Sequence, residues 1–504
     1  MQPTSKPLNP GRPVPASPRV KPALLPKESV VKFVDAPKDH GLQNVGSYIL
    51  AVLIFVIYSR VLDVNNAIAS LRLPLLMSIA VLAIAFMTGS VVDRIGIPGL
   101  YLFGFTMWVL IGSPFGFYRA QSLLTVIEMV KSFLIFTACA ALIATVRQSR
   151  RLMLAVALSS LASALMSGFF GEMKYGRLSI TQGGLGDPNA YAMFLLLGLP
   201  MWWYLARRTS RYAVKLICWG CTIPIFTAIA KTGSRGGMVA LAALLLMVFF
   251  HASIMKKVQI MIVGVIFLGV LYVTLPPYLK ARYFTLFAAE TAAQLGVDEA
   301  KLESDVGSSE ERYKLLINSL LITMRNPIFG VGAGNFVHYA EAEARKRGSR
   351  TGGQPTHNTY TEISSEAGLP ALILFSGAIV FTFRRMSLFL KTKLPAASKD
   401  LPDMAHAVRY LRMSLVSSLV CCFFLSYAYK GIFQPLLGII TGVITVAFGE
   451  LMRAKAAAES AAKDTLAASG PGPAVGPGNR PGPGGVRPKS QPPFRGNVPA
   501  LGKL

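Results

Sequence analysis

The chain has 504 residues, of which 53% are hydrophobic and only 15% are charged, and its mean hydropathy is +0.49. A soluble protein of this length carries more charge, so the composition indicates a protein that spans a membrane. The formal net charge of +27 would suggest nucleic-acid binding in a soluble protein. In a membrane protein, basic residues also gather in loops and tails that face anionic lipid, so we expect membrane lipids and no nucleic acid as partners.

The sequence contains none of the short motifs that identify common metal or cofactor sites. It has no HExxH segment, no phosphate-binding lysine loop and no Asp/Glu cluster with metal-ligand spacing, so we expect neither a metal nor a cofactor. Every cysteine lies in an apolar stretch, where a thiol packs as a small hydrophobic group. No disulfide framework is therefore predicted for Cys139, Cys218, Cys221, Cys421 and Cys422.

Residues 1–44 are rich in Pro, Lys and Arg and contain no apolar core, which predicts a disordered basic tail rather than a signal peptide. About twelve apolar stretches follow, each near the roughly 20 residues that a bilayer requires. Backbone groups in lipid must be paired internally, so the predicted fold is all-α and polytopic. Nine spans are expected within 45–275 and three within 368–452, at about 46–62, 73–90, 98–112, 123–146, 151–170, 189–206, 212–230, 236–252, 257–275, 368–383, 410–428 and 432–450.

Short basic connections predict the orientation of these spans. Arginines or lysines follow the fourth, sixth, eighth and tenth spans, at 147–151, 207–211, 256–257 and 384–385. Both termini are basic too, so the positive-inside rule places them in the cytoplasm, together with a Pro/Gly-rich disordered tail at 453–504. The long segment 276–367 between spans nine and ten is then expected on the outer side.

Charged residues within the predicted spans are scarce. Glu128 and Lys131 are spaced i, i+3 on the fourth helix, where they can neutralise one another as a structural pair. An ion-coupled carrier usually needs ionisable groups at the membrane midplane, so this scarcity argues against one. The candidate functional residues lie in the outward connections instead.

The connection before the sixth span contains Arg177 and ends in Gly186-Asp187-Pro188-Asn189. Asp187 can cap the following helix and Pro188 suits its first position, so capping is the expected role of Asp187. Arg177 has no such structural explanation, and either solvation or binding accounts for it.

The next outward connection, Thr232-Gly233-Ser234-Arg235-Gly236-Gly237, opens the eighth span. A helix N-terminus offers free amide donors and a partial positive charge, and glycines let a ligand approach the backbone. With donors from Ser234 and Arg235, the segment predicts a phosphate site. The alternative is that Ser234 only caps the helix and Arg235 only reaches toward water.

The long outward segment contains an amphipathic stretch that is expected at the outer membrane surface. Ser308 and Glu311 have the spacing of a capping box, and apolar residues recur at helical spacing from 313 until Asn326-Pro327. Arg312 would then lie in the first helical turn, where a cation opposes the helix dipole, so it needs a separate explanation. The glycine-rich segment 329–336 lacks the spacing of a dinucleotide fingerprint and is predicted to be a turn.

His357 lies in Pro355-Thr356-His357-Asn358, just before a short helix that ends at Gly368, with Pro370 starting the tenth span. A histidine near a helix start has its imidazolium form disfavoured, so His357 would stay neutral and able to accept a proton. His338 is expected at the surface.

Four of these segments, in this order, resemble the O-antigen ligase/polymerase superfamily: Gly-Asp-Pro-Asn-Ala-Tyr-Ala at 186–192, Thr-Gly-Ser-Arg-Gly-Gly at 232–237, Asn-Pro-Ile-Phe-Gly-Val-Gly-Ala-Gly-Asn-Phe at 326–336, and His-Asn-Thr-Tyr at 357–360 before Glu-Ala-Gly-Leu-Pro. The resemblance covers roughly 170–385. It implies a metal-independent, inverting glycosyltransferase of the bacterial inner membrane, with its active site facing the periplasm. The implied donor is a glycan on undecaprenyl diphosphate, and the implied acceptor is a sugar or lipid A core, with other polysaccharide-assembly proteins as further partners.

The resemblance also assigns roles to particular residues. Arg235 and Arg312 match the arginines that would hold the diphosphate, Arg177 matches a less uniform one, and His357 matches the proposed general base. Ser234 would add a diphosphate donor, and the residues expected to shape the site are Asp187, Asn189, Gly236 and Asn358. A polymerase is favoured slightly over a ligase. A flippase or transporter would explain twelve spans equally well but should carry its cations inside the bundle, and a scaffold with basic tails would leave the outward arginines unexplained.

Overall fold

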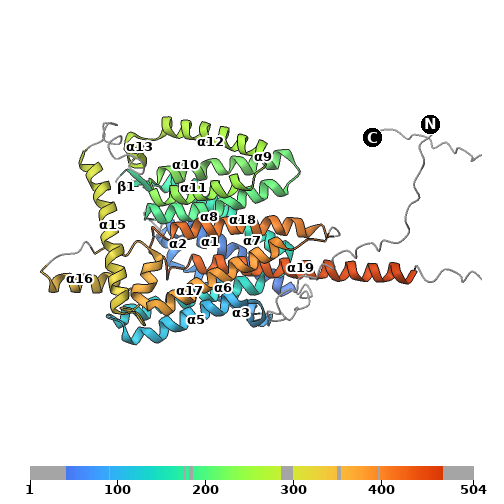
Figure 1. Ribbon diagram of the computed structural model, residues 1–504, viewed down its shortest axis with the longest axis horizontal. Coiled ribbons are helices and arrows are strands. Elements are labelled where there is room, and N and C mark those ends of the chain that lie inside the picture. Colours follow the sequence, from blue (N-terminus) through green and yellow to red (C-terminus); the bar gives the residue numbers. More distant parts are fainter. Residues whose placement is uncertain are drawn as a thin grey trace, which may run out of the picture. The chain divides into compact units, whose positions relative to one another are not determined.

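The structure is a computed structural model that describes residues 41–89, 91–174, 176–180, 186–284, 299–348, 353–395 and 398–468. The chain divides into a unit that ends at Ala454 and a second unit that begins at Lys455. Helices make up nearly all the secondary structure of the described residues, which confirms the predicted all-α membrane fold (Figure 1). A hairpin of β1 (Glu172–Lys174) and β2 (Arg177–Ser179) was not expected from the sequence.

In the first half of the chain, long helices alternate with short turns. The elements before β1 are α1 (Gly41–Ser59), η1 (Val61–Val64), α2 (Asn66–Ser70), α3 (Leu73–Met87), α4 (Val91–Arg94), α5 (Gly96–Gly112), η2 (Ser113–Phe115), α6 (Arg119–Leu142) and α7 (Val146–Phe170). The remaining elements are α8 (Pro188–Arg208), α9 (Tyr212–Gly220), α10 (Thr222–Lys231), α11 (Arg235–Phe250), α12 (Ile254–Thr274), α13 (Pro277–Phe284), α15 (Glu299–Arg325), α16 (Phe336–Lys346), α17 (Thr359–Lys391), α18 (Asp400–Cys421) and α19 (Phe433–Ala468).

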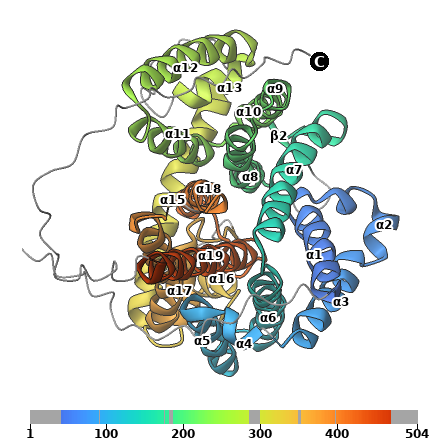
Figure 2. The same ribbon diagram turned by 90° about the vertical axis from the view of Figure 1, so that its right-hand side faces the viewer.

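Among the described residues, nine helices are long and apolar enough to cross a membrane. Each of the twelve expected spans corresponds to a helix or a pair of helices, but α8, α11 and α18 are outside that set of nine. Helices α8 and α18 pack against each other near the middle of the first unit (Figure 2). Since α8 buries most of its side chains against protein, it needs less hydrophobicity than a helix that faces lipid.

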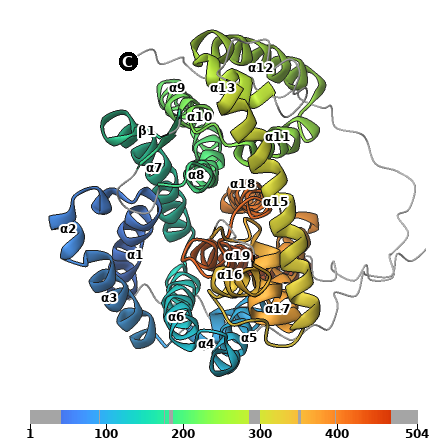
Figure 3. The same ribbon diagram turned by 90° about the vertical axis from the view of Figure 1, so that its left-hand side faces the viewer.

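Three helices of the long connecting segment gather at one end of the first unit, which we call the α15 end. Helix α15 crosses this end from the neighbourhood of α13 to α17, roughly perpendicular to the spans (Figures 1 and 3). One face of α15 is buried, through Ser319, Ile322 and Thr323, whereas Tyr313, Ile317 and the rest of its apolar stripe are exposed. An exposed apolar stripe agrees with the expected position at a membrane surface.

Three predicted boundaries are wrong. Helix α15 begins at Glu299, so Ser308 and Glu311 form no capping box at its start and Arg312 lies well inside the helix. Helix α19 continues to Ala468, into the expected tail, because the Ala-, Glu- and Lys-rich stretch after 453 favours helix. Helix α1 begins at Gly41, and the rest of the two expected tails, 1–40 and 469–504, lies outside the described residues.

Other local predictions are confirmed. Glu128 and Lys131 form an ion pair of 2.7 Å, with both side chains more than half exposed. The cysteines are all unpaired. The segment 329–336 is a turn in which Gly330, Gly332 and Gly334 have positive φ.

The predicted break at Gly368 is also confirmed. Gly368 has φ 84° and ψ 174°, so α17 consists of a short first half and a long second half. The break frees the Ala367 carbonyl, which accepts a hydrogen bond of 3.1 Å from the Trp108 indole, and the Leu369 amide, which donates to the Pro327 carbonyl at 2.8 Å. The first half of α17 can therefore lie at the α15 end while the second half continues as a span.

We expect Gly368→Ala to lower the free energy of unfolding by about 2 kcal/mol or more. The backbone conformation is one that only glycine adopts readily, and an added Cβ would overlap the Ile328 carbonyl oxygen. Thermal unfolding in detergent measures the effect. The control is Gly264→Ala in α12, where an added Cβ meets nothing within 4 Å and a helical alanine is favourable; equal unfolding temperatures for the two variants would contradict the assignment.

Candidate active site

The turn Thr232-Gly233-Ser234 joins α10 to α11 and is the centre of the candidate site. Ser234 caps α11, because its Oγ accepts a hydrogen bond of 3.0 Å from the Gly237 amide. Gly233 has φ 60°, and a Cβ there would lie 2.8 Å from the Leu279 side chain and 3.3 Å from the stems of Arg177 and Arg282. Glycine at this position therefore lets two arginine side chains pack across the turn.

Those two arginines bind the turn through its carbonyl groups. Arg177, from β2, donates from Nε to the Thr232 carbonyl at 3.0 Å, and Arg282, from α13, donates from Nε to the Gly233 carbonyl at 2.8 Å. Both guanidinium groups are thus fixed at the N-terminus of α11, where the helix dipole already contributes positive charge. Arg282 is only 6% exposed.

Asn189 connects this turn to α8. Its Oδ1 accepts from Arg177 Nη2 and from Ser234 Oγ, both at 2.9 Å, and its Nδ2 donates to Asp187 Oδ1 at 3.1 Å. Asp187 caps α8 as predicted, by accepting from the Asn189 amide at 2.9 Å. Ser234 is buried and its hydroxyl proton is engaged with Asn189, so it positions the turn rather than offering a free donor.

Arg235 and Arg312 complete a group of four arginines. Arg235, the first residue of α11, lies within electrostatic range of Arg282 and Arg312, and Arg312 lies within range of Arg282 and Asp187. Arg312 reaches this place because α15 contacts α13 as it crosses the α15 end (Figure 3). Residues from β2, α11, α13 and α15, far apart in sequence, therefore meet at one helix start.

Positive charge exceeds negative charge in this group. Burial, followed by the charges of Arg282 and Arg312, lowers the pKa of Arg177 to about 10, and the Asp187 carboxylate only partly opposes this. Burial is also the main cause that lowers the pKa of Arg312, again with Arg282 adding to it and Asp187 opposing it. Guanidinium groups stay protonated at neutral pH, so the group favours an anion of more than one charge.

His357 lies within electrostatic range of Arg312 and is held through its backbone amide. It has φ 51°, an uncommon conformation for a residue with a side chain, and its amide donates to Ser426 Oγ at 2.9 Å. Its Nε2 lies 3.4 Å from Gln354 Oε1. Asn358 then caps α17, its Oδ1 accepting from the Tyr360 and Thr361 amides at 3.0 and 3.2 Å.

The pKa of His357 is lowered from its usual value. The first cause is burial, followed by the Arg312 guanidinium; Asp187 opposes these effects and Lys430 adds a smaller lowering. The neutral imidazole expected from the sequence is thus favoured, although burial and cations produce it rather than the helix start alone. Arg312 and His357 also lie within electrostatic range of each other, so a predicted diphosphate ligand and the predicted base belong to the same region.

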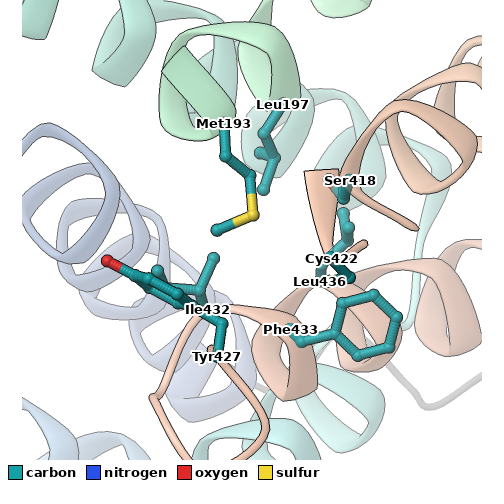
Figure 4. A pocket seen from close by; sticks show the side chains of 8 residues that line it. All are labelled: Met193, Leu197, Ser418, Cys422, Tyr427, Ile432, Phe433 and Leu436. Carbon is teal, nitrogen blue, oxygen red and sulfur yellow. The ribbon is translucent and has the colours of Figure 1, made fainter. Parts of the chain in front are cut away.

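Loop 422–432, between α18 and α19, lies next to His357. Ser426 anchors the His357 amide, and Lys430 lies with Nζ 4.6 Å from the centre of the Tyr427 ring. Below the loop is a small apolar pocket between α8, α18 and α19, lined by Met193, Leu197, Ser418, Cys422, Tyr427, Ile432, Phe433 and Leu436 (Figure 4). The apolar side chains of this pocket pack beneath the loop, and they provide few polar groups that could bind a charged ligand.

The structure brings most of the predicted site residues together, and it adds two residues that were not predicted. The following predicted residues belong to this one end: Arg177, Arg235, Arg312, Ser234, Asp187, Asn189 and His357. Gly236 packs against Phe424 of loop 422–432, and a Cβ at Gly236 would lie 2.6 Å from the Phe424 ring. Arg282 and Lys430 were missed. The sequence signal for Arg282 was a basic residue in the short aromatic segment 277–284. The signal for Lys430 was a lysine in an outward connection of only three residues.

His338, by contrast, is exposed, as predicted, and lies beside Tyr118. Among the residues that the structure describes, no group of three or more His, Cys, Asp or Glu side chains could hold a metal ion.

Comparison with protein families identifies the segment that contains most of these residues. Residues 220–376 match the family model described as O-antigen ligase. The match begins in α9 and ends in the second half of α17, so it includes Arg235, Arg282, Arg312 and His357. No curated protein matches the chain. This match supports the resemblance of segment 220–376 to the O-antigen ligase/polymerase superfamily.

Proposed function

We propose that the chain is an inverting glycosyltransferase that transfers glycan from undecaprenyl diphosphate to a sugar hydroxyl in surface-polysaccharide synthesis. The observation that carries this proposal is the grouping of four arginines around the start of α11, with Asp187 as the opposing carboxylate and His357 within electrostatic range of Arg312 and Asp187. A lipid-linked diphosphate supplies the multiple negative charges that such a group favours. The bond to diphosphate already stores the driving force, so the reaction needs no nucleotide or other cofactor.

In this proposal the arginines have two roles. Arg235 and Arg312 bind the diphosphate. Arg177 and Arg282 donate hydrogen bonds from Nε to the carbonyls of the turn, so they hold the turn in place and add positive charge to the site. Negative charge grows on the diphosphate as its bond to the sugar breaks. Fixed guanidinium groups stabilise that developing charge more in the transition state than in the ground state. The charge stabilisation is thus assigned to arginine rather than to a metal ion.

His357 is the proposed general base. The acceptor hydroxyl oxygen attacks the anomeric carbon from the side opposite the diphosphate, and its proton passes to the neutral imidazole of His357. The bond between the anomeric carbon and the diphosphate oxygen breaks, and the electron pair leaves with the diphosphate. Attack from the opposite side inverts the anomeric configuration. The lowered pKa of His357 keeps the imidazole able to accept the proton near neutral pH.

The choice of acceptor separates a polymerase from a ligase, and we favour the polymerase slightly because of the large outward segment and the unusual tails. Purified protein with lipid-linked repeat units alone distinguishes the possibilities. Chain growth supports a polymerase, transfer only after lipid A core is added supports a ligase, and movement of the lipid without bond formation supports a flippase. The arginines of the candidate site lie in β2, at the first residue of α11 and in α13 and α15, at the α15 end, rather than along the middle of the spans, which argues against a flippase.

We also propose that the α15 end faces the periplasm across the bacterial inner membrane, with both termini in the cytoplasm. The basic connections at the opposite ends of the spans support this orientation. Labelling of single cysteines placed at an exposed position of α16 and at Lys231, the exposed last residue of α10, by a membrane-impermeant reagent tests it, since both positions should react from the periplasmic side.

Arg235→Ala and Arg312→Ala should each reduce turnover by about 100-fold or more, the usual effect of removing one donor that stabilises transition-state charge. Both proteins should reach normal levels in the membrane, because removing one cation lowers the repulsion among the remaining arginines. The assay is glycan transfer by purified protein. Arg345→Ala in α16, whose side chain is 81% exposed, is the matched control, and full-length polysaccharide from both test variants would refute the diphosphate assignment.

The rate of transfer should fall as pH decreases through the pKa of His357, because protonation removes the base. Since that pKa is lowered, the fall should lie below the ordinary histidine value of about 6.5. Lys430→Met removes a cation that lowers this pKa, so the fall should move to higher pH. His357→Ala should block transfer while donor binding persists.

The pH–rate profile of purified protein checks these shifts, with Lys346→Met in α16 as a control that should leave the profile unchanged. Retained turnover in His357→Ala, or an unaltered profile in Lys430→Met, would remove His357 from the role of base.

A further inference from the structure

Two carboxylates on the first half of α17 have no part in the proposed chemistry, yet both are engaged with backbone amides. Glu362 Oε2 accepts from the Ala428 amide at 3.0 Å. Glu366 accepts from two amides, with Oε2 bound to Gly334 at 2.6 Å and Oε1 bound to Phe336 at 2.9 Å. Within the described part of the chain, no ion pair includes either carboxylate. They lie one helical turn apart, on the same face of α17, and bind two different segments of the chain.

Glu366 fixes the glycine-rich turn 330–336 that follows α15. The Gly332 amide also donates to the Glu366 carbonyl at 2.8 Å, and the Val331 amide donates to the Ser365 carbonyl at 3.0 Å. The turn lies so close to α17 that a Cβ at Gly330 would overlap the Glu366 carbonyl carbon. The turn and this part of α17 therefore have little freedom to move apart.

The same contacts fix the end of α15. The Leu369 amide donates to Pro327, and Thr323 Oγ1 lies 2.9 Å from Ser364 Oγ, so the last turns of α15 are attached to α17 next to the Glu366 contacts. Arg312 lies on this same continuous helix. The position of Arg312 thus depends on how firmly the far end of α15 is held.

Glu362, one turn earlier on the same face of α17, binds loop 422–432 instead. Thr359 Oγ1 donates to the Leu425 carbonyl at 2.7 Å and accepts from the Tyr427 amide at 3.1 Å, next to the bond between Ala428 and Glu362. Ser426, in the same loop, binds the His357 amide. Glu362 therefore lies in the network that sets the backbone of the proposed base.

We infer that Glu362 and Glu366 are positioning residues that fix His357 and Arg312 relative to each other, Glu362 through loop 422–432 and Glu366 through turn 330–336 and α15. This inference rests on the proposed function, since it assigns Arg312 to the diphosphate and His357 to the acceptor. A carboxylate suits the role because it has two acceptor oxygens and no donor, so Glu366 satisfies two buried amides at once. A glutamine in its place can accept from one amide and directs an NH₂ group at the other.

A double-mutant cycle on the full-length protein in lipid nanodiscs tests the role of Glu366, with undecaprenyl diphosphate itself as the binding probe. We expect Glu366→Gln to weaken binding about tenfold and Arg312→Ala to weaken it at least as much. Because Glu366 acts through Arg312, the double variant should bind no more weakly than Arg312→Ala alone. A loss of stability without a positioning role would not produce this non-additivity.

Two further variants sharpen the result. Glu362→Gln should keep its affinity for undecaprenyl diphosphate but reduce the rate of transfer, whereas Glu343→Gln, in an exposed ion pair of α16, should change neither quantity. If Glu366→Gln does not accumulate in the membrane, Glu366→Asp takes its place in the cycle, because it keeps the charge and shortens the side chain by one methylene group.

The possible failures are distinguishable. Wild-type affinity in the Glu366 variant, or multiplication of the two losses in the double variant, overturns the positioning role. Wild-type affinity in Arg312→Ala instead overturns the proposed function, since the diphosphate site would then lie elsewhere.

Discussion

Electrostatic repulsion among four guanidinium groups at one helix start is the constraint on which the rest of the site depends. Arg177, Arg235, Arg282 and Arg312 come from different elements, and Asp187 supplies the opposing carboxylate. Such a group stays together only if other interactions hold it. The carbonyls of Thr232 and Gly233 do so for two members, and α15 carries a third into place. A bound diphosphate would relieve the repulsion that remains, which agrees with the ligand that we propose.

Two of these arginines are fixed by hydrogen bonds to backbone carbonyls. Arg177 and Arg282 are bound to backbone, and their charges do not reorient when a ligand arrives. Fixed charges of this kind cost little reorganisation during reaction, which is the physical basis of electrostatic catalysis. Asn189 extends the same principle to α8, since one amide side chain links Arg177, Ser234 and Asp187.

The sequence predicts the parts of this molecule that depend on local physics. Helix capping by Asp187 and the break at Gly368 follow from side-chain geometry within a few residues, and both are confirmed. Ser234 caps α11, which the sequence offered only as the alternative to a diphosphate donor. The start of α15 was missed because a good capping pattern at Ser308 competes with helix-favouring residues before it. Arg282 and Lys430 were missed because their importance depends on contacts with segments about 50 and 70 residues away, Gly233 for one and His357 for the other, which no local pattern contains.

The proposed donor and acceptor halves of the site come from two groups of elements. The turn before α11, together with β2 and α13, holds Arg177, Arg235 and Arg282, whereas the first half of α17 and loop 422–432 hold His357. Helix α15 contacts both α13 and α17, and so connects the two groups. An inverting reaction needs the base and the leaving group on opposite sides of one carbon atom, and a small error in that alignment is costly. In the proposed function, the dense hydrogen bonding where α15 ends against α17 would keep the base and the leaving group aligned.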